Sequence, residues 1–182
     1  MSRKYKFWDN EKLYFISFAV VHWIDVFIRS DYKYELINSW KYCIDNKGLE
    51  VYGWCIMTSH VHMIIGSNQN KLEDTVRDMK SYTSTKLHKA IQDHPQESRR
   101  EWMLWMMERA GKKNSNNASF QFWQQHNQPI ELNSNYLMDQ KLEYIHSNPV
   151  EAGFVDNADE WLFSSARDYA GKKGLLEICF IE

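Results

Sequence analysis

The sequence predicts an α+β fold: a ferredoxin-like, split βαβ antiparallel sheet with helices on one face and an appended C-terminal helix that bears a tyrosine. Hydrophobic periodicity places the segments in the order β-α-β-β-α-(β)-α, which is the order of a split βαβ sheet. The chain has 182 residues, of which 43% are hydrophobic and only 7 are Gly and 3 Pro. This composition excludes collagen-like and wholly disordered chains, and the length predicts a single domain over residues 1–182.

The first two elements are a strand and a helix. Leu13–Val21 is rich in β-branched and aromatic residues, which predicts a strand. Ser30 or Asp31 is expected to cap the following helix, and Gly48 stands where a glycine commonly ends one. The apolar side chains of this helix recur at the spacing of a buried face, at Leu36, Ile37, Trp40, Cys43 and Ile44.

A β-hairpin and a second helix come next. Leu49–Met57 and His60–Ile65 are two short apolar runs separated by Thr58-Ser59, and we expect them to pair. Asn70 with Glu73 three residues later resembles a capping box, which predicts the start of a helix. The expected buried face of this helix consists of Leu72, Val76, Met79, Thr83 and Leu87.

The stretch from about residue 93 to 119 interrupts this pattern, and we interpret it as an insertion into the domain. It contains a short predicted helix, Glu101–Arg109, followed by Gly111–Asn117, whose composition predicts a mobile loop. A strand is expected within Phe120–Leu132.

The last predicted element is a helix that begins near Ser134 or Asn135. We expect it to end at Asn148, because Pro149 disfavours helical geometry in the residue before it.

Overall charge and cysteine content limit the function classes. The formal net charge is −2 and the pI about 6.4, so any nucleic-acid surface must be local. Three scattered cysteines, without CxxC spacing, predict neither a disulfide framework nor a zinc knuckle. The apolar run near the N-terminus is too short to span a bilayer and lacks the flanks of a signal peptide, so we expect a cytoplasmic protein.

One helix face provides such a local basic surface. No acidic residue occurs from Lys80 to Gln92. Basic side chains there can neutralise phosphates and hydroxyls can hydrogen-bond them, although most such faces are simply solvated. The candidate DNA-binding residues are Arg77, Lys80, Ser81, Ser84, Lys86 and Lys89. Trp8, Trp102, Trp105 and Trp123 are candidates for stacking on unpaired bases, although Trp102 and Trp105, at helical spacing, could instead be packing residues or form a dimer contact.

Two motifs could support chemistry. His60 and His62 alternate along a predicted strand, so both point to one face about 6.5 Å apart, where two imidazoles could bind one metal ion. The alternative is a pair of histidines with hydrogen-bond partners inside the sheet. Tyr144 and Asn148 are four residues apart near a helix end and therefore share one side of that helix.

Taken together, the two motifs resemble those of the HUH-type single-strand DNA transposases, more closely the REP-associated tyrosine transposases and their insertion-sequence relatives. The resemblance rests on IMTSHVHMII (Ile56–Ile65) and YIHSNPVEAGFV (Tyr144–Val155). FWQQ (Phe122–Gln125) and WLFSSARDY (Trp161–Tyr169) also resemble family segments in the same order.

This resemblance implies roles for individual residues. His60, His62 and Asn148 would bind a divalent metal, Mg²⁺ or Mn²⁺, and Tyr144 would be the nucleophile that forms a 5′-phosphotyrosine intermediate. It also implies single-stranded, hairpin-forming DNA as the partner and, since relatives differ in which subunit uses the tyrosine helix, a possible homodimer.

The sequence departs from the family in two places, at Thr58-Ser59, where Pro-Asn is common, and at 125–128, where relatives have a short Arg-bearing segment. No general base stands out, because His126 and His146 are both expected to be polar surface residues. Two other functions stay open: a DNA or RNA hairpin-binding module that does not cut, and a metal-dependent phosphoesterase that uses water.

Overall fold

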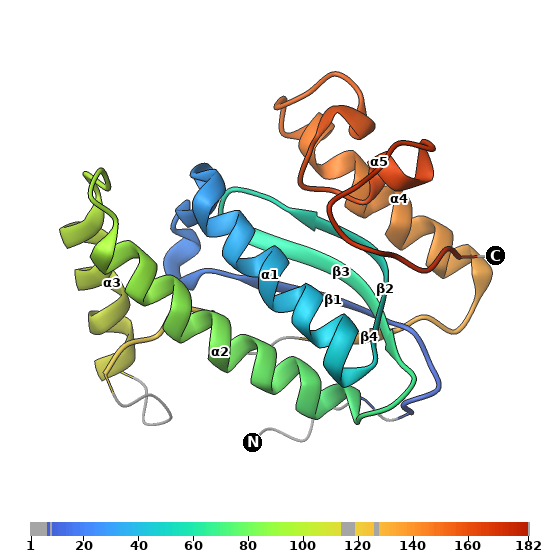
Figure 1. Ribbon diagram of the computed structural model, residues 1–182, viewed down its shortest axis with the longest axis horizontal. Coiled ribbons are helices and arrows are strands. Elements are labelled where there is room, and N and C mark those ends of the chain that lie inside the picture. The colour runs from blue at the N-terminus through green and yellow to red at the C-terminus, as the bar shows by residue number, and fades with distance from the viewer. Residues whose placement is uncertain (1–6, 8, 114–118, 126–127, 182) are drawn as a thin grey trace.

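A four-stranded antiparallel sheet organises the chain, and the computed structural model describes residues 7, 9–113, 119–125 and 128–181 of it. The strands lie in the order β2-β3-β1-β4 (Figure 1). Their bounds are β1 Tyr14–Ala19, β2 Leu49–Ile56, β3 His60–Ser67 and β4 Ile130–Glu131. Every neighbouring pair is antiparallel, which confirms the predicted split βαβ sheet.

The register of the central strands decides which face each β3 side chain occupies. β3 pairs with β1 so that His60 lies opposite Ala19 and His62 opposite Ser17. Side chains alternate along a strand. Val61 and Met63 therefore enter the larger core on one face, while the two histidines point to the other.

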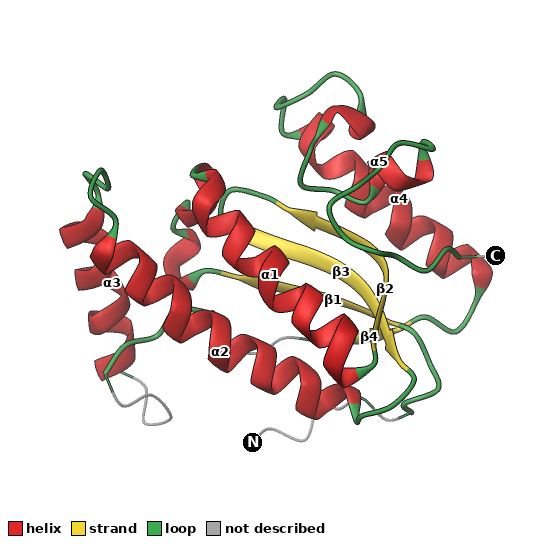
Figure 2. Cartoon of the chain, in the orientation of Figure 1, coloured by secondary structure: helices red, strands yellow, loops and turns green. Residues whose placement is uncertain are grey.

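Two long helices cover the first face of the sheet, α1 (Ser30–Lys47) and α2 (Leu72–Asp93) (Figures 1 and 2). Gly48 ends α1 with φ 68°, the left-handed geometry that favours glycine there. The predicted caps are wrong. Arg29, not Ser30 or Asp31, precedes α1, and Lys71 precedes α2, in both cases without a side-chain cap.

The expected capping box at Asn70 fails because this side chain is used elsewhere. Its Nδ2 donates to the Lys47 carbonyl oxygen at 3.0 Å, so it ties the start of α2 to the end of α1.

Helix α4 (Asn135–Glu151) covers the opposite face of the sheet. Ser134 caps it by accepting a hydrogen bond from the Leu137 N–H at 3.3 Å. The helix does not end at Asn148 as predicted, because Pro149 removes only one backbone donor. It continues for three more residues, to Glu151, and its last carbonyls accept hydrogen bonds from Ala152 and the two residues after it.

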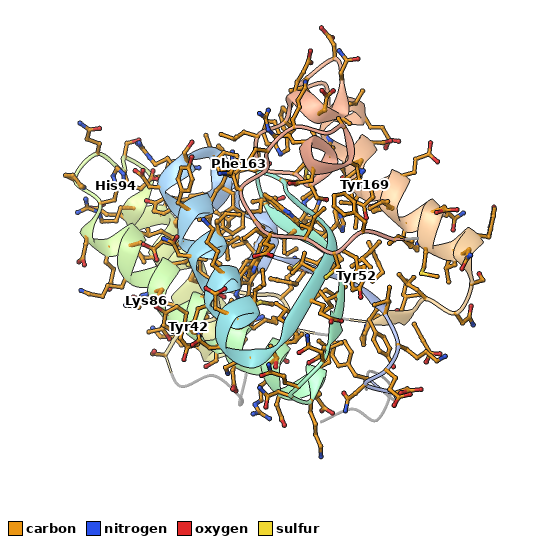
Figure 3. All side chains as sticks on the ribbon, turned by 45° about the vertical axis from the view of Figure 1, so that its right-hand side comes forward. Tyr42, Tyr52, Lys86, His94, Phe163 and Tyr169 are labelled. Atoms are coloured by element: carbon orange, nitrogen blue, oxygen red, sulfur yellow. The ribbon has the colours of Figure 1, made fainter. Side chains whose placement is uncertain are left out.

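The segment after α4 fastens this helix to β2. It includes the short helices η3 (Ala158–Glu160) and α5 (Ala166–Tyr169). Ser165 Oγ accepts the Trp54 backbone N–H at 2.9 Å and lies 2.8 Å from Nε2 of His146 on α4. The Tyr169 hydroxyl donates to the Tyr52 carbonyl at 2.8 Å (Figure 3). His146 is thus mostly buried and bonded, and the expectation that it lies on the surface is wrong.

Helix α3 (Arg100–Lys112) lies beside a loop that contains η1 (Val21–Trp23) and η2 (Val26–Ile28). It contributes Met103 and Met107 to the larger core and includes the predicted helix Glu101–Arg109. Of the expected mobile loop Gly111–Asn117, the first two residues are the end of α3 instead, and residues 114–117 lie outside the described residues.

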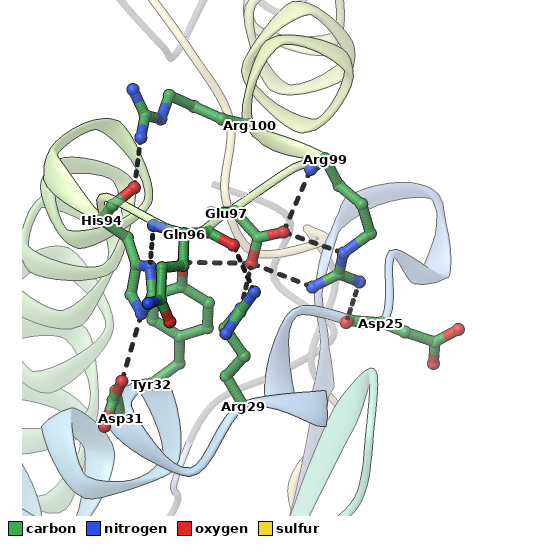
Figure 4. Close-up of polar contacts among 9 residues, drawn as sticks. All are labelled: Asp25, Arg29, Asp31, Tyr32, His94, Gln96, Glu97, Arg99 and Arg100. Atoms are coloured by element: carbon green, nitrogen blue, oxygen red, sulfur yellow. Dashed lines mark hydrogen bonds and ion pairs between the residues drawn. The ribbon is translucent and has the colours of Figure 1, made fainter.

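Glu97, between α2 and α3, holds these parts together (Figure 4). Its carboxylate accepts hydrogen bonds from Arg29 Nε at 3.0 Å, from Arg99 Nε at 3.0 Å and from the Tyr32 hydroxyl at 3.2 Å. Arg99 also donates to the Asp25 carbonyl at 2.9 Å. The linker, the start of α1 and the loop before it therefore share one buried carboxylate.

Within the part of the chain that the structure describes, no helix combines the length and the apolar character needed to cross a membrane.

Candidate active site

His60 and His62 meet on the sheet face that α4 covers. Their ring centroids are 4.8 Å apart, and the rings are nearly perpendicular. His62 is 4% exposed and stacks on Phe15 of β1 with the centroids 5.7 Å apart. The strand alternation inferred from the sequence thus brings the two imidazoles together.

Tyr144 of α4 lies over the same position. Its ring centroid is 5.1 Å from that of His62 and 6.0 Å from that of Phe15. Ile145 buries the neighbouring side of α4 against the sheet, whereas Tyr144 stays 43% exposed. The phenol is therefore held against the histidines and still open to solvent.

Asn148 completes the group one helical turn after Tyr144. Its Nδ2 donates to the Tyr144 carbonyl at 2.9 Å, so Oδ1 is the atom of this side chain that can accept. Burial lowers the pKa of His60, and a hydrogen bond with the Asn148 side chain opposes this effect. The structure therefore brings together four residues that are distant in sequence: His60, His62, Tyr144 and Asn148.

The environment of His62 points to a ligand. Neither of its ring nitrogens has a hydrogen-bond partner among the described residues, although both are buried. Burial, aided by the charges of His60 and Lys141, lowers the pKa of His62 to about 3, so the ring is neutral at physiological pH. A buried polar group without a partner is costly. For His62, this finding argues against a ring satisfied within the sheet and fits a nitrogen that could bind a metal, whereas His60 has hydrogen-bond partners in Ser59 and Asn148.

The donor set differs from common metal sites. No group of three or more His, Cys, Asp or Glu side chains in the described ranges is placed to hold a metal ion. A metal here would use two imidazoles and the amide oxygen of Asn148, a mixed nitrogen and oxygen set that suits Mn²⁺ or Mg²⁺ with remaining positions for water or phosphate.

Sequence reasoning missed Lys141. Its Nζ lies 5.0 Å from the Phe15 ring centroid and 5.8 Å from that of Tyr144. It stands three residues before Tyr144, so helical spacing could have identified it. A cation at this place attracts a phosphate towards the phenol.

The candidate DNA-binding residues lie away from Tyr144, and they do not all lie together. They lie on α2, on the opposite side of the sheet from α4 (Figure 1). Arg77 is ion-paired with Asp74 at 2.6 Å and with Asp78 at 3.1 Å, and Lys89 is paired with Asp93 at 2.8 Å. These pairs are exposed and weak.

Three of the six residues line a hollow between α2 and the segment after α3. Lys80, Ser81 and Ser84 line a hollow of about 300 Å³ together with residues 121–125. Burial lowers the pKa of Lys80 to about 8. Lys86 is exposed (Figure 3). Its Nζ lies 5.5 Å from the Tyr82 ring centroid.

The candidate stacking tryptophans differ in exposure. Trp123 is 5% exposed, and its Nε1 donates to Thr83 at 3.0 Å, so it is a core residue and not a stacking platform. Trp102 and Trp105 are more than half exposed. Trp8 and His126 lie outside the described residues.

Another tryptophan, Trp23, lies at the site and was not singled out from the sequence. Its ring centroid is 5.4 Å from that of His60, and it is 59% exposed. His22 and Trp23 both have φ 56°, a left-handed conformation that is uncommon for residues other than glycine. No sequence pattern predicts such a backbone.

Comparisons with known proteins identify the family and support the fold. Residues 19–140, more than half of the chain, match the family model described as "Transposase IS200 like". The match includes both histidines and ends before Tyr144. No curated protein matches the chain.

Two solved structures are similar to this one. A REP-associated tyrosine transposase bound to a REP hairpin has 16% sequence identity and a TM-score of 0.63, over 100% of this chain and 94% of that chain. A proposed transposase from Deinococcus radiodurans has 16% identity and a TM-score of 0.45, over 79% of this chain and 95% of that chain. The first likeness supports the fold.

Proposed function

This chain belongs to the IS200-like transposase family, and from that membership we propose that it cuts and rejoins single-stranded DNA by transesterification, with Tyr144 as the nucleophile. One observation carries the proposal. The Tyr144 ring lies 5.1 Å from His62, a neutral buried imidazole whose two nitrogens have no partner among the described residues. A phenol beside an imidazole that is available to bind a metal is what a metal-assisted tyrosine nucleophile requires.

The reaction balances without an energy source. The Tyr144 oxygen forms a bond to phosphorus as the bond from phosphorus to the 3′ oxygen breaks, and the phenolic proton is in net terms transferred to that 3′ oxygen. One phosphodiester replaces another, so the 5′-phosphotyrosine keeps the bond energy for rejoining. The partial exposure of Tyr144 leaves room for the strand, and Lys141 attracts the phosphate.

His60, His62 and Asn148 would hold the divalent metal, Mg²⁺ or Mn²⁺. Such an ion polarises the phosphate and stabilises negative charge on the leaving oxygen. The Ser59 hydroxyl lies 3.2 Å from Nδ1 of His60 and orients that ring. The neutral state of His62 supports its role because a protonated imidazole cannot bind a metal.

A hairpin with an unpaired flank is the substrate to test first, because the similar tyrosine transposase was solved with a REP hairpin. We expect the DNA contacts of α2 to come from Arg77, Lys80, Ser81, Ser84, Lys86 and Lys89. The protein would act in the cytoplasm, where its DNA is accessible.

Covalent capture tests the nucleophile. The protein is mixed with single-stranded hairpins that have randomised flanks in Mn²⁺ and then denatured, and attached DNA is measured. We expect an adduct that Tyr144→Phe abolishes. Tyr136→Phe is the matched control, since Tyr136 lies on the same helix and is 76% exposed. An adduct that persists in Tyr144→Phe would refute the assignment.

The same assay separates the alternatives. Cutting that produces no adduct and that persists in Tyr144→Phe would indicate a phosphoesterase that uses water. Hairpin binding without an adduct or cutting would indicate a binding module. His62→Ala should abolish cutting and retain most DNA binding, and unchanged cutting would refute the metal-ligand role.

A further inference from the structure

A hollow beside the histidine pair has no role in the chemistry proposed above. It measures about 860 Å³ and opens between the loop before α1, the helix α3 and residues 121–125. Trp23 forms one wall, and Met106, Arg109 and Lys113 belong to the other. Because Trp23 also contacts His60, only the Trp23 side chain lies between the hollow and this candidate metal ligand.

The charge of this hollow suits a phosphate backbone. None of its lining residues is acidic. Arg109 and Lys113 are exposed, and neither forms an ion pair with any residue that the structure describes. They differ in this respect from Arg77 and Lys89 of α2, which acidic neighbours already pair. Among the described residues these are two cations beside the site without an ion-pair partner, although the Arg109 guanidinium lies 5.1 Å from the Trp105 ring centroid.

The backbone at Trp23 has a left-handed conformation that residues other than glycine rarely adopt. The left-handed conformation of His22 and Trp23 persists because the loop is bonded on several sides. The Val20 N–H donates to the Ser59 carbonyl at 2.8 Å, the Val21 N–H to the Phe122 carbonyl at 2.7 Å, and the Phe27 N–H to the Thr58 carbonyl at 2.8 Å.

The Glu97 network fixes the same loop to α3 through Arg99 and the Asp25 carbonyl (Figure 4). Both walls of the hollow are thus held in position before any ligand arrives. An indole presented in this way, 59% exposed and next to cations, is suited to stack on an aromatic ring of a polyanion.

We propose that Trp23 is a stacking platform for an unpaired base adjacent to the scissile phosphate, and that Arg109 and Lys113 bind the phosphates of the same strand in the hollow. This inference rests on the proposed function, since it assumes that a single strand passes Tyr144 and His60. It assigns the substrate contact to a base face and to backbone charge, so the contact does not depend on base identity.

The test separates stacking from charge by using two strands with equal numbers of phosphates. The probes are fluorescein-labelled oligothymidylate of about twelve nucleotides and an abasic strand of the same length. Binding is measured in the Tyr144→Phe background, where no covalent product forms. The variants are Trp23→Asn, chosen because Asn tolerates left-handed backbone, and Trp23→Phe, which keeps an aromatic face.

We expect the background protein to bind oligothymidylate about tenfold more tightly than the abasic strand. Trp23→Asn should remove this preference and leave binding of the abasic strand unchanged, whereas Trp23→Phe should retain most of it. Tyr42→Ala, which removes an aromatic ring that is also 59% exposed but lies outside the hollow, should change nothing. Arg109→Gln or Lys113→Gln should weaken both strands and reduce the salt dependence by about 0.7 in slope.

No preference in the background protein, a preference that survives in Trp23→Asn, or a loss caused by Tyr42→Ala would each overturn the inference. Covalent capture with the otherwise unchanged chain keeps this result distinct from the proposed function. A Trp23-dependent preference without any adduct would support the stacking role of Trp23 and refute the proposed transposase chemistry. An adduct without that preference would support the transposase chemistry and refute the stacking role of Trp23.

Discussion

Replacement of Glu97 by Gln is predicted to destabilise the fold in a pH-dependent way. The carboxylate is 1% exposed, and three polar side chains donate to it. Burial raises the pKa of Glu97, but the hydrogen bonds and charges of Arg99 and Arg29 outweigh this effect and hold the pKa at about 2, below its ordinary value of 4.5. The difference corresponds to about 3 kcal/mol of folding free energy. Water screens the two arginines, which are 33% and 30% exposed, so this figure is an upper value.

The sign of the pH dependence follows from the depressed pKa. The ionised carboxylate stabilises the fold at every pH above about 4.5, and this contribution is lost as the pH falls towards 2. Urea unfolding at several pH values between 7 and 3 should give a free-energy difference between the original protein and Glu97→Gln of about 2 to 3 kcal/mol at pH 7 that shrinks below pH 4.5. Glu101→Gln, an exposed position on α3, should shift stability by less than about 0.5 kcal/mol. A difference under about 1 kcal/mol at pH 7, or one that is constant down to pH 3, would refute the reasoning.

Three further predictions concern the tyrosine helix. Ser165→Ala leaves His146 and a buried backbone N–H without a partner, so calorimetry should show a loss of about 1 to 3 kcal/mol and covalent capture a lower adduct yield. Ser134→Ala removes a helix cap and should cost about 1 kcal/mol in urea unfolding, with cutting retained. Because Tyr144 contacts His62 of its own chain, a mixture of His62→Ala and Tyr144→Phe proteins should form no adduct, and restored capture would instead indicate exchange of the helix between subunits.

The fold was predictable because its signals are local. Strand alternation and helical spacing depend only on neighbouring residues, and they identified the hairpin, α1, α2 and α4. The N-terminal cap of α2 was not predictable, because Asn70 reaches a carbonyl 23 residues away and the expected local bond does not form. The end of α4 was also predicted wrongly, because Pro149 does not stop a helix that continues only a few residues beyond it.

The candidate site was partly predictable. Two motifs 80 residues apart converge because β3 lies in the centre of the sheet and α4 crosses it, which neither motif alone determines. Lys141 could have been found by helical spacing from Tyr144. Trp23 could not, because its position depends on a strained loop held by partners as distant as Phe122 and Arg99.

The sheet stands between α2 and Tyr144, and this separation sets a condition on any DNA that contacts both. Layers packed on a sheet are about 10 Å from it, so the path from one face to the other turns sharply round the edge of the domain. Duplex DNA has a persistence length of about 150 base pairs and resists such a turn. A paired stem held by α2 would therefore have to end before the turn, and the strand that continues to the tyrosine would be unpaired. The thickness of the protein would then determine how many nucleotides separate the foot of the hairpin from the cut.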